Sequence, residues 1–281
     1  MTLALNPGRI GISVGQMEAI ELADEYGFGA VTPDAGYLAG LGDSEMSALK
    51  DEMANRDLVF SAAGVPVQFR EDRETFRRDL LDLPAHAKTL ARAGVSRAGT
   101  WIMPTHAERT YHQNFELHAR RLRPVARILQ DHGIRFGLEY VASPDLYIRD
   151  RYPFVHDLAE TMDLIGEIGY DNMGLVLDAW HWHFAEDGRE ALLDLSPEDV
   201  VVVDLNDAPD VPLEEQQDTV RRLPTTTGVI DLEAFLTALS ETGYTGPVRA
   251  EPFDDSLGEM GPEKAVARTA ETMRAALDLV G

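Results

Sequence analysis

The sequence predicts an α/β protein with the (β/α)8 barrel fold, formed as a single domain by residues 1–281. Short β-branched and apolar runs alternate with longer amphipathic stretches along the chain, and eight such strand-then-helix units are the count of that fold. The apolar runs are continuous, as expected for parallel strands buried on both faces. An open doubly wound sheet is the alternative. However, Gly11 and Gly15 near the first run do not form the GxGxxG turn typical of that fold.

The eight predicted strands share a short apolar core between turn residues. They are Arg9–Val14, Gly29–Asp34, Leu58–Ala63, Arg97–Pro104, Arg135–Val141, Met173–Trp180, Val200–Asp207 and Val248–Phe253. The predicted helices carry apolar residues at helical spacing, which is the main signal for an amphipathic helix. They are Gln16–Tyr26, Ser44–Arg56, Arg73–Ala93, Gln113–His132, Phe154–Ile168, Gly188–Leu193, Leu232–Glu241 and Pro262–Leu279.

Turn and capping residues support several of these boundaries. Three glycines follow predicted helices and precede predicted strands, namely Gly133, Gly169 and Gly243. Glycine commonly ends a helix in this way, because it adopts a left-handed conformation without strain. Pro153 and Pro262 stand where helices are expected to begin, and proline is tolerated in a first helical turn. Asp231 precedes an apolar-periodic run and is a natural N-cap.

The net charge excludes one large class of partner. Lys and Arg total 25 and Asp and Glu total 49, so the formal net charge is −24. Such a surface repels phosphate backbones, which argues against nucleic-acid binding. Without cysteine, disulfides and thiolate metal sites are excluded. No apolar run is long enough for a membrane span, and the N-terminal residues do not resemble a signal peptide, so we expect a cytoplasmic protein without a membrane partner.

The basic residues are unevenly distributed between the two types. Only three are lysines, Lys50, Lys88 and Lys264, and the rest are arginines. Acidic excess with few lysines is typical of proteins from salt-adapted cells, where dissolved salt screens repulsion between carboxylates. A GC-rich genome that favours arginine codons explains the same composition. Both interpretations stay open at this point.

Four acidic residues lie near the carboxyl ends of predicted strands five to eight, one on each strand. These are Glu139, Asp178, Asp204 and Glu251, and each lies in an otherwise apolar run. An isolated carboxylate is very costly to bury. Because the carboxyl ends of parallel strands meet at one mouth of a barrel, we expect the four to converge there.

The sequence offers few cations to pair with these acids. On the same strands only Arg135 and Arg249 occur, and both lie nearer the strand starts. A divalent metal at the barrel mouth would satisfy all four charges at once. The alternative is that one or two of the acids accept backbone N–H bonds or pair with distant arginines.

The chain resembles the xylose isomerase-like TIM barrels, the sugar phosphate isomerase and epimerase superfamily. The motifs that carry the resemblance are LEYV at 138–141, LDAWHWHF at 177–184, VDLNDAP at 203–209, RRLPTTTGVIDL at 221–232 and AEPF at 250–253. In that family Glu, Asp, His and Glu from strands five to eight bind the metal. The resemblance implies that Glu139, Asp178 and Glu251 are three of these ligands. It also implies that His181, three residues after Asp178, contacts the substrate.

One position departs from the family pattern. The seventh strand of the family commonly carries a histidine ligand, and Asp204 stands there in this sequence. Asp204 either replaces the imidazole as the fourth ligand, or the site has lost metal affinity. We favour the first, because aspartate keeps the position anionic. An all-oxygen site suits Mn²⁺ or Mg²⁺ better than Zn²⁺.

Several further residues are candidates for substrate binding. Trp101 and Trp180 lie near strand ends, where aromatic rings stack on sugars or pack the rim. Asp145 follows Glu139 by six residues, where the family often has a second acid. Arg221 lies in the longest non-periodic stretch, 208–230, which follows strand seven and falls on the catalytic face of a barrel. We expect His106, His112 and His118 to be ordinary loop and helix residues, and we choose His181 over His183 because the two alternate along an extended segment.

The resemblance implies a metal-dependent isomerase or epimerase that moves a proton next to the carbonyl of a sugar or keto-sugar. Glu139 and Glu251 are the expected catalytic acids and bases, acting through an enediolate. A dehydratase or lyase acting on a keto-sugar, inosose or 3-keto-glycoside is the first alternative, because it would use the same site. A sugar-binding barrel that has lost its metal is the second. We expect a small carbohydrate as partner and allow for a homo-oligomer.

Endonuclease IV shares this fold and is a candidate from another functional class. It uses a histidine-rich zinc site and binds DNA. This chain has eight histidines, of which the last is His183, and its net charge is −24. Both features argue against that function.

Overall fold

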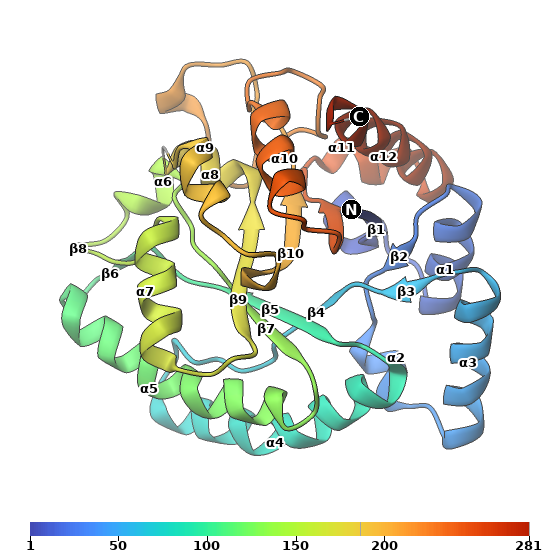
Figure 1. The fold of residues 1–281 in the computed structure, drawn as a ribbon, viewed down its shortest axis with the longest axis horizontal. Helices are drawn as coiled ribbons and strands as arrows, with labels where there is room; N and C mark the ends of the chain where they lie inside the picture. The colour runs from blue at the N-terminus through green and yellow to red at the C-terminus, as the bar shows by residue number, and fades with distance from the viewer. Residues whose placement is uncertain (186, 281) are drawn as a thin grey trace.

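The computed structural model describes residues 1–185 and 187–280. Parallel strands form one sheet in the order β3-β2-β1-β11-β10-β9-β7-β5-β4 (Figure 1). Their bounds are β1 Thr2–Leu5, β2 Ala30–Val31, β3 Val59–Phe60, β4 Ala62–Gly64, β5 Arg97–Trp101, β7 Arg135–Glu139, β9 Met173–Asp178, β10 Val200–Leu205 and β11 Pro247–Ala250. The alternation of strands and helices confirms the predicted (β/α)8 barrel.

The two edges of this sheet belong to one predicted strand. β3 pairs with β2, and β4 pairs with β5, while only Ser61 separates β3 from β4. The backbone N–H of Ser61 donates to the carbonyl of Val31 at 2.9 Å. The predicted strand 58–63 is therefore interrupted at Ser61, and its two halves bring the edges together into a nearly closed barrel.

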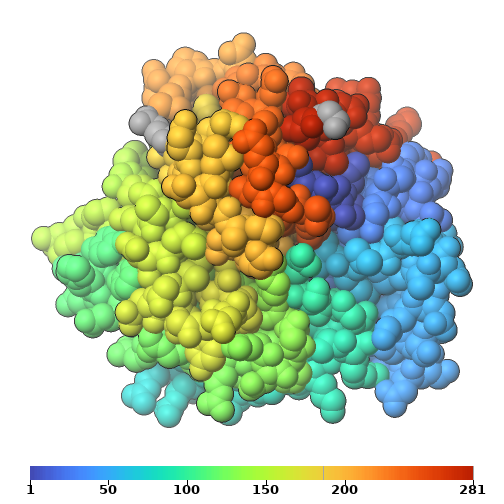
Figure 2. Space-filling model, viewed as in Figure 1, coloured from blue at the N-terminus to red at the C-terminus, as the bar shows by residue number. Residues whose placement is uncertain are grey.

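Helices lie around the sheet (Figure 1), and Figure 2 shows the same face with all atoms drawn. Their bounds are α1 Gln16–Glu25, α2 Ala35–Ala39, α3 Asp43–Asn55, α4 Arg73–Ala93, α5 Tyr111–Gln130, α6 Pro144–Tyr147, α7 Leu158–Ile168, α8 Ala179–Phe184, α9 Arg189–Leu193, α10 Leu232–Glu241, α11 Asp255–Glu259 and α12 Pro262–Leu277. Short 3-10 helices are η1 Pro7–Ile10, η2 Pro197–Asp199, η3 Leu213–Glu215 and η4 Asp278–Val280. None of the helices in the described part of the chain has the length and apolarity needed to cross a membrane.

Two sequence predictions about element boundaries are wrong. The first strand is β1, Thr2–Leu5, and the predicted strand 9–14 begins within η1 instead. Pro7 at the start of η1 fixes a helical backbone dihedral there and lacks an N–H for a strand ladder. Pro153 does not begin a helix either: it lies in β8, Tyr152–Pro153, which pairs antiparallel with β6, Thr105–His106.

Where a predicted helix boundary agrees with the structure, the predicted capping residue explains it. Gly133, Gly169 and Gly243 all have φ near +70° to +84°, the left-handed region that glycine tolerates. Asp231 accepts a hydrogen bond from the backbone N–H of Ala234 at 3.0 Å, and α10 begins at the next residue, as predicted. α7 begins at Leu158 because Asp157, rather than Pro153, is its N-cap.

A row of glycines lets the barrel interior pack tightly. Gly99, Gly137 and Gly174 are register partners on β5, β7 and β9. A Cβ added at Gly99 or Gly137 would lie 2.6 or 2.8 Å from a methyl group of Val176, closer than carbon atoms approach. The interior core is therefore small, with Val176 packed against Ala62 and Val202. This leaves space at the carboxyl ends of the strands for polar side chains.

Candidate active site

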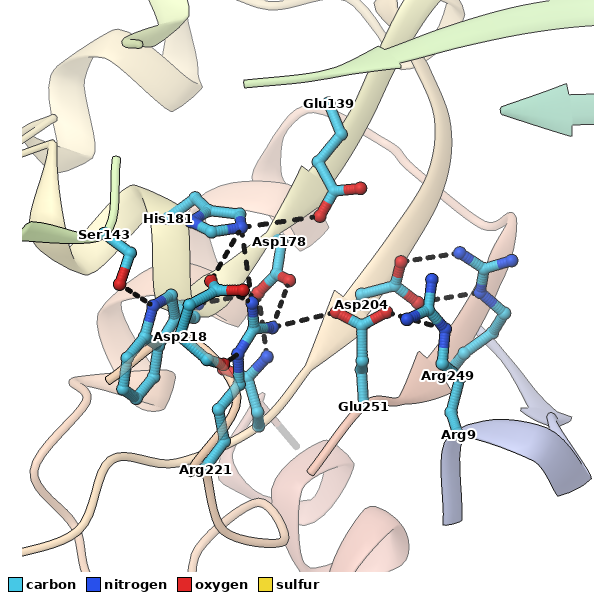
Figure 3. A network of polar contacts seen from close by, with 12 residues as sticks. Arg9, Glu139, Ser143, Asp178, His181, Asp204, Asp218, Arg221, Arg249 and Glu251 are labelled. Carbon is cyan, nitrogen blue, oxygen red and sulfur yellow. Dashed lines mark hydrogen bonds and ion pairs between the residues drawn. The ribbon is translucent and has the colours of Figure 1, made fainter. Parts of the chain in front are cut away.

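The four predicted carboxylates do converge at the carboxyl ends of the strands (Figure 3). Glu139 and Asp178 are the last residues of β7 and β9. Asp204 lies in β10 and is the register partner of Asp178, and Glu251 directly follows β11. All four are buried, with exposed fractions of 9% or less. Because these parallel strands end on the same side of the barrel, the four carboxylates lie in one small region although they are far apart in the sequence.

The expectation that few cations lie near these acids is wrong. Arg221 is 1% exposed, and its Nη1 atom donates to Asp178 Oδ2 at 2.7 Å and to Glu251 Oε2 at 2.8 Å. Its Nη2 atom donates to Asp218 Oδ1 at 2.8 Å. One buried guanidinium therefore joins carboxylates from two strands and a loop. Arg221, a candidate from the non-periodic stretch 208–230, thus lies among the predicted carboxylates.

The loop after β10 is folded so that it carries Arg221 into the barrel mouth. Asp207, at the end of this strand, accepts backbone N–H bonds from four consecutive residues of the returning loop, 227–230, at 2.8–3.2 Å. Asp207 and Arg222 also exchange backbone hydrogen bonds at 2.8 Å. Both contacts hold the two ends of the loop together, so Arg221 is directed inward.

Aromatic rings flank the Arg221 guanidinium. Its central carbon lies 5.1 Å from the ring centroid of Trp180 and 4.8 Å from that of Phe253. The Trp180 indole N–H donates to Ser143 Oγ at 3.3 Å, and the ring is fully buried. Trp180 therefore stabilises Arg221 by a cation–π contact. Its ring is buried and does not offer an exposed face on which a sugar could stack.

Asp204 has a different arginine partner. Arg249, on the neighbouring strand β11, donates from Nε to Oδ1 at 2.7 Å and from Nη2 to Oδ2 at 2.5 Å. This bidentate pair is buried inside the barrel, with 2% of the Asp204 side chain and 11% of the Arg249 side chain exposed. Asp204 is thus already neutralised by a residue that the sequence appeared to place too near the strand start.

Glu139 is the exception among the four acids. Among the described residues it has no arginine partner, and its nearest charged or polar contact is His181 Nε2 at 3.6 Å from Oε1. Burial, together with the neighbouring Glu251 and Asp178, raises the pKa of Glu139 well above its ordinary value. Burial also raises the pKa of Glu251 to about 8, although Arg9 and Arg221 oppose the shift. Both carboxyl groups therefore hold a proton more readily than an exposed glutamate does.

Asp178 stays ionised in the same region. Burial alone would raise its pKa, but Arg221 and His181 lower it below the ordinary range. Its Oδ1 atom also accepts hydrogen bonds from the Trp180 backbone N–H and the Asn206 side-chain amide, both at 2.8 Å. The pKa values of Asp178 and Glu139 thus shift in opposite directions. Both oxygens of Asp178 accept hydrogen bonds, whereas Glu139 has no arginine partner among the described residues.

The formal charges of the site leave an excess of two negative charges. Five carboxylates form the network, namely Glu139, Asp178, Asp204, Asp218 and Glu251. Three arginines pair with them, namely Arg9, Arg221 and Arg249. Burial lowers the pKa of His181 to about 4, so the imidazole adds no charge at neutral pH. Because the pKa values of Glu139 and Glu251 are raised, bound protons offset part of this formal excess, and a divalent cation would offset it in their place.

His181 faces the site, although for a different reason from the one predicted. Residues 179–184 form α8, so His181 and His183 lie on different sides of a helix and do not alternate along an extended segment. The backbone N–H of Ala142 donates to His181 Nδ1 at 3.3 Å. Arg221 Nη2 lies 3.3 Å from Nε2 and can only donate there, so both ring nitrogens face an N–H donor, although a neutral imidazole has a single acceptor nitrogen. Nε2 also lies 3.6 Å from Glu139 Oε1 and 3.7 Å from Asp218 Oδ1.

The donor set fits a divalent metal, with a changed set of ligands. Glu139, Asp178 and His181 each offer a ligand atom within 4.8 Å of the others. Glu139 and Asp178 supply the carboxylate oxygens of this group, and His181 supplies a ring nitrogen. Of the other two predicted ligands, Asp204 is bound through both oxygens by Arg249, whereas Glu251 shares Arg221 with Asp178. Carboxylate oxygens are the donors that Mg²⁺ and Mn²⁺ prefer.

Of the two remaining predicted residues, Trp101 and Asp145, one lines a cavity of about 300 Å³ over this network. Trp101, at the end of β5, is 38% exposed and lines the cavity with Glu139, Glu251, His181 and Arg221. Asp145, on α6, does not line it. Its Oδ1 atom accepts from Ser143 Oγ at 2.6 Å and from the backbone N–H of Asp218 at 3.3 Å. Asp145 therefore positions the segment that carries Asp218.

Sequence reasoning missed three members of the network. Arg9 donates to Glu251 at 2.9 Å from η1, a segment that was predicted as strand. Asp218 lies in an acidic stretch without hydrophobic periodicity, which is typical of an exposed loop. Its ion pair with Arg221 depends on how that loop folds. Asn206 had a usable signal, because it directly follows a buried strand in the motif that contains Asp204.

Known proteins with similar sequences include sugar-processing enzymes. The chain is 28% identical over 157 residues to inosose isomerase of Bacillus velezensis, which is 56% of this chain and 53% of that protein. It is 30% identical over 138 residues to 3-dehydroshikimate dehydratase of Pseudomonas aeruginosa, which is 48% of this chain and 20% of that protein. The matched segment thus spans about half the length of the inosose isomerase.

Solved structures match the whole chain. A xylose isomerase domain protein from Alicyclobacillus acidocaldarius subsp. acidocaldarius has a TM-score of 0.83 at 31% identity, covering 99% of this chain and 98% of that one. The IolI protein with a bound zinc atom has a TM-score of 0.82 at 21% identity, covering 100% and 98%. The profile of the xylose isomerase-like TIM barrels matches residues 20–276. With this match, the barrel and the carboxylates at its strand ends, the chain belongs to the family of xylose isomerase-like TIM barrels.

Proposed function

We propose that the protein is a sugar isomerase or epimerase that moves a proton next to the carbonyl of a keto-sugar. The observation that carries the proposal is the pair Glu139 and Glu251. Both carboxyl groups line one cavity, point towards each other from different strands, and have raised pKa values (Figure 3). A general acid and base works best when its pKa lies near the operating pH. The similarity to inosose isomerases supports a cyclic or open-chain hydroxyketone as substrate.

Glu139 is the proposed base. In the described structure it is the acid of the four without an arginine partner, so its ionised form keeps its basicity. Glu251 is the proposed second acid–base group, and Arg9 and Arg221 hold its carboxylate in place. Return of the proton to the other face of the same carbon gives an epimer, and its return to the neighbouring carbon gives an aldose–ketose isomer.

The proposed electrophilic groups are Arg221 and His181. The Arg221 guanidinium and the His181 ring both line the cavity. The guanidinium can donate a hydrogen bond to a substrate oxygen that gains negative charge, and the His181 ring can do so in the tautomer that carries its proton on Nε2. Glu139 and Asp178 would hold a divalent metal, for which we propose Mn²⁺ or Mg²⁺. Such an ion polarises a carbonyl as a Lewis acid when it is bound.

A dehydratase is the second candidate. The similarity to 3-dehydroshikimate dehydratase favours it. Proton removal by Glu139 would be common to both reactions, and the difference would lie in whether a β-hydroxyl group is expelled afterwards. The products distinguish the two, because only the dehydratase yields an unsaturated carbonyl compound with strong ultraviolet absorption.

The experiment is deuterium uptake from D2O by a panel of ketoses and inososes in the presence of Mn²⁺. We expect exchange at the carbon next to the carbonyl. Glu139→Gln should lower the exchange rate by about 10²–10⁴-fold and keep the fold, since glutamine has the same shape without the basicity. Glu21→Gln, at an exposed position on α1 outside both the network and the cavities, is a control variant. Exchange by Glu139→Gln within about tenfold of the wild-type rate would show that another residue is the base.

A further inference from the structure

A second cavity adjoins the candidate active site. Its volume is about 440 Å³, and it shares Trp101 and Met103 as a common wall with the cavity over the carboxylates. Its other walls come from the segment after β4, from β6 and from α5. A group bound here would therefore lie next to a sugar ring bound over Glu139.

Two residues that line this second cavity have buried acceptor atoms without partners. Asn114 Oδ1 and His118 Nε2 have no hydrogen-bond partner among the described residues, and the two residues are 2% and 4% exposed. His118 Nδ1 lies 2.8 Å from the carbonyl oxygen of Asn114, so Nδ1 donates and Nε2 carries the free lone pair. Burial of both acceptors without a donor is unfavourable. The wall is therefore suited to hydroxyl groups of a ligand.

The same cavity presents donors. Arg70 and Arg109 line it, and neither forms an ion pair with a carboxylate in the described part of the chain. Arg70 lies over the Trp101 ring at 3.8 Å from its centroid, and Arg109 contacts the His106 ring. These contacts position the guanidinium groups and leave N–H donors free, since each guanidinium has five.

The formal charge of the cavity is balanced. Glu71 and Asp150 also line it, and Asp150 accepts a hydrogen bond from Thr105 Oγ1 at 3.0 Å. The two carboxylates offset Arg70 and Arg109, while burial lowers the pKa of His118 to about 3 and keeps that ring neutral. The cavity therefore offers many donors and acceptors without a net charge, beside an aromatic ring. This combination suits an uncharged polyhydroxylated ring.

We propose that this cavity is a second sugar subsite, so that the substrate carries a further polyhydroxylated ring attached to the reacting one. The proposal rests on the proposed function and narrows its substrate class to glycosides or disaccharides. His118 and Asn114 are the acceptors for the hydroxyl groups of the outer ring. The prediction that His118 is an ordinary helix residue is replaced by this assignment.

The test compares the binding of one ring with that of two. Isothermal titration with glucose, maltose, cellobiose and trehalose should show at least one disaccharide binding about tenfold more tightly than glucose, the gain from a few added hydrogen bonds. His118→Phe should weaken that disaccharide by about fivefold, the effect of one lost hydrogen bond. Ligand-observed NMR should show less saturation transfer to the outer ring in this variant.

His132→Phe is the matched control variant. His132 Nδ1 also lies 2.8 Å from the carbonyl oxygen four residues earlier, but the residue is outside the cavity. His132→Phe should bind the disaccharide as the wild type does. Should His118→Phe fail to fold, Arg109→Met at the half-buried rim tests the same subsite and should also weaken the disaccharide.

The outcomes separate this inference from the proposed function. If all three disaccharides bind no more tightly than glucose, or if both variants bind them as the wild type does, the subsite is overturned. Deuterium exchange with single-ring ketoses would then still support the proposed function. Disaccharide binding that depends on His118, without exchange of any ketose, would support the subsite and overturn the proposed reaction.

Discussion

Asp178 and Asp204 are register partners on neighbouring strands, and each is neutralised by an arginine from a different kind of element. Arg221 reaches Asp178 from the loop after β10, and it contacts Glu251 and Asp218 at the same time. Arg249 reaches Asp204 from β11 within the barrel and binds it through both carboxylate oxygens. Asp178 therefore shares its arginine with two other carboxylates, whereas both oxygens of Asp204 are occupied by an arginine of its own.

The difference suggests separate roles for the two pairs. An arginine shared among three carboxylates on a loop can give up one of them to a cation or substrate and keep the others. An arginine on a barrel strand is fixed by the sheet, and Arg249 occupies both carboxylate oxygens of Asp204. We therefore expect Asp178 to act in chemistry and Asp204 to act in stability.

The largest expected effect is on stability at the strand pair. Arg249→Met leaves Asp204 buried without a cation, and removal of one partner of a buried pair typically costs about 3–5 kcal/mol. Arg221→Met should cost less in protein loaded with Mn²⁺, since the cation offsets the freed carboxylates. Urea unfolding of both variants at the same Mn²⁺ concentration measures the difference.

A double variant controls for simple loss of packing. Asp204→Leu combined with Arg249→Met should recover most of the lost free energy of unfolding, because apolar residues often replace a buried ion pair without loss. If Arg249→Met alone stays within about 1 kcal/mol of the wild type, the pair does not hold the barrel and the comparison fails.

The next effect concerns metal binding. Mn²⁺ at about 100 times its dissociation constant should raise the free energy of unfolding by about 2.7 kcal/mol. Asp178→Asn should lose this increment, and Asp204→Asn should keep most of it. Isothermal titration and chemical unfolding with and without Mn²⁺ measure both. If Asp204→Asn loses the increment as well, the four-carboxylate site predicted from the sequence is restored.

The smallest expected effect is the salt dependence of the melting temperature, which distinguishes the repulsion between surface carboxylates from the buried ion pairs. With 49 acidic against 25 basic residues, the surface repels itself in dilute buffer. Screening shortens from about 10 Å at 0.1 M salt to about 3 Å at 1 M. The melting temperature of metal-loaded protein should therefore rise with KCl by a few degrees. The deficit of Arg249→Met should stay the same at every KCl concentration, because salt screens buried charges little. A melting temperature independent of KCl would remove the argument for a salt-adapted source.

The sequence by itself determined the barrel and the location of its acidic centre. The order of strands and helices follows from local periodicity, capping residues and glycines, which act over a few residues. Carboxylates such as Glu139 at the ends of apolar strands must meet at the mouth, since parallel strands end on the same side. The first strand was missed because Thr2–Leu5 has only four residues, whereas the stretch 9–14 is longer and carries β-branched apolar residues at every second position.

Only the tertiary structure decided how the charges of that centre are balanced. Arg221 and Asp178 are 43 residues apart, and Arg249 and Asp204 are 45 apart, so no local pattern connects them. Their pairing depends on the path of a non-periodic loop and on the register between β10 and β11. The same holds for the unpaired acceptors of Asn114 and His118, because a side chain lacks a partner only in relation to everything packed around it. The sequence supplies the charged and polar groups, and the packed barrel decides which of them are left free for a ligand.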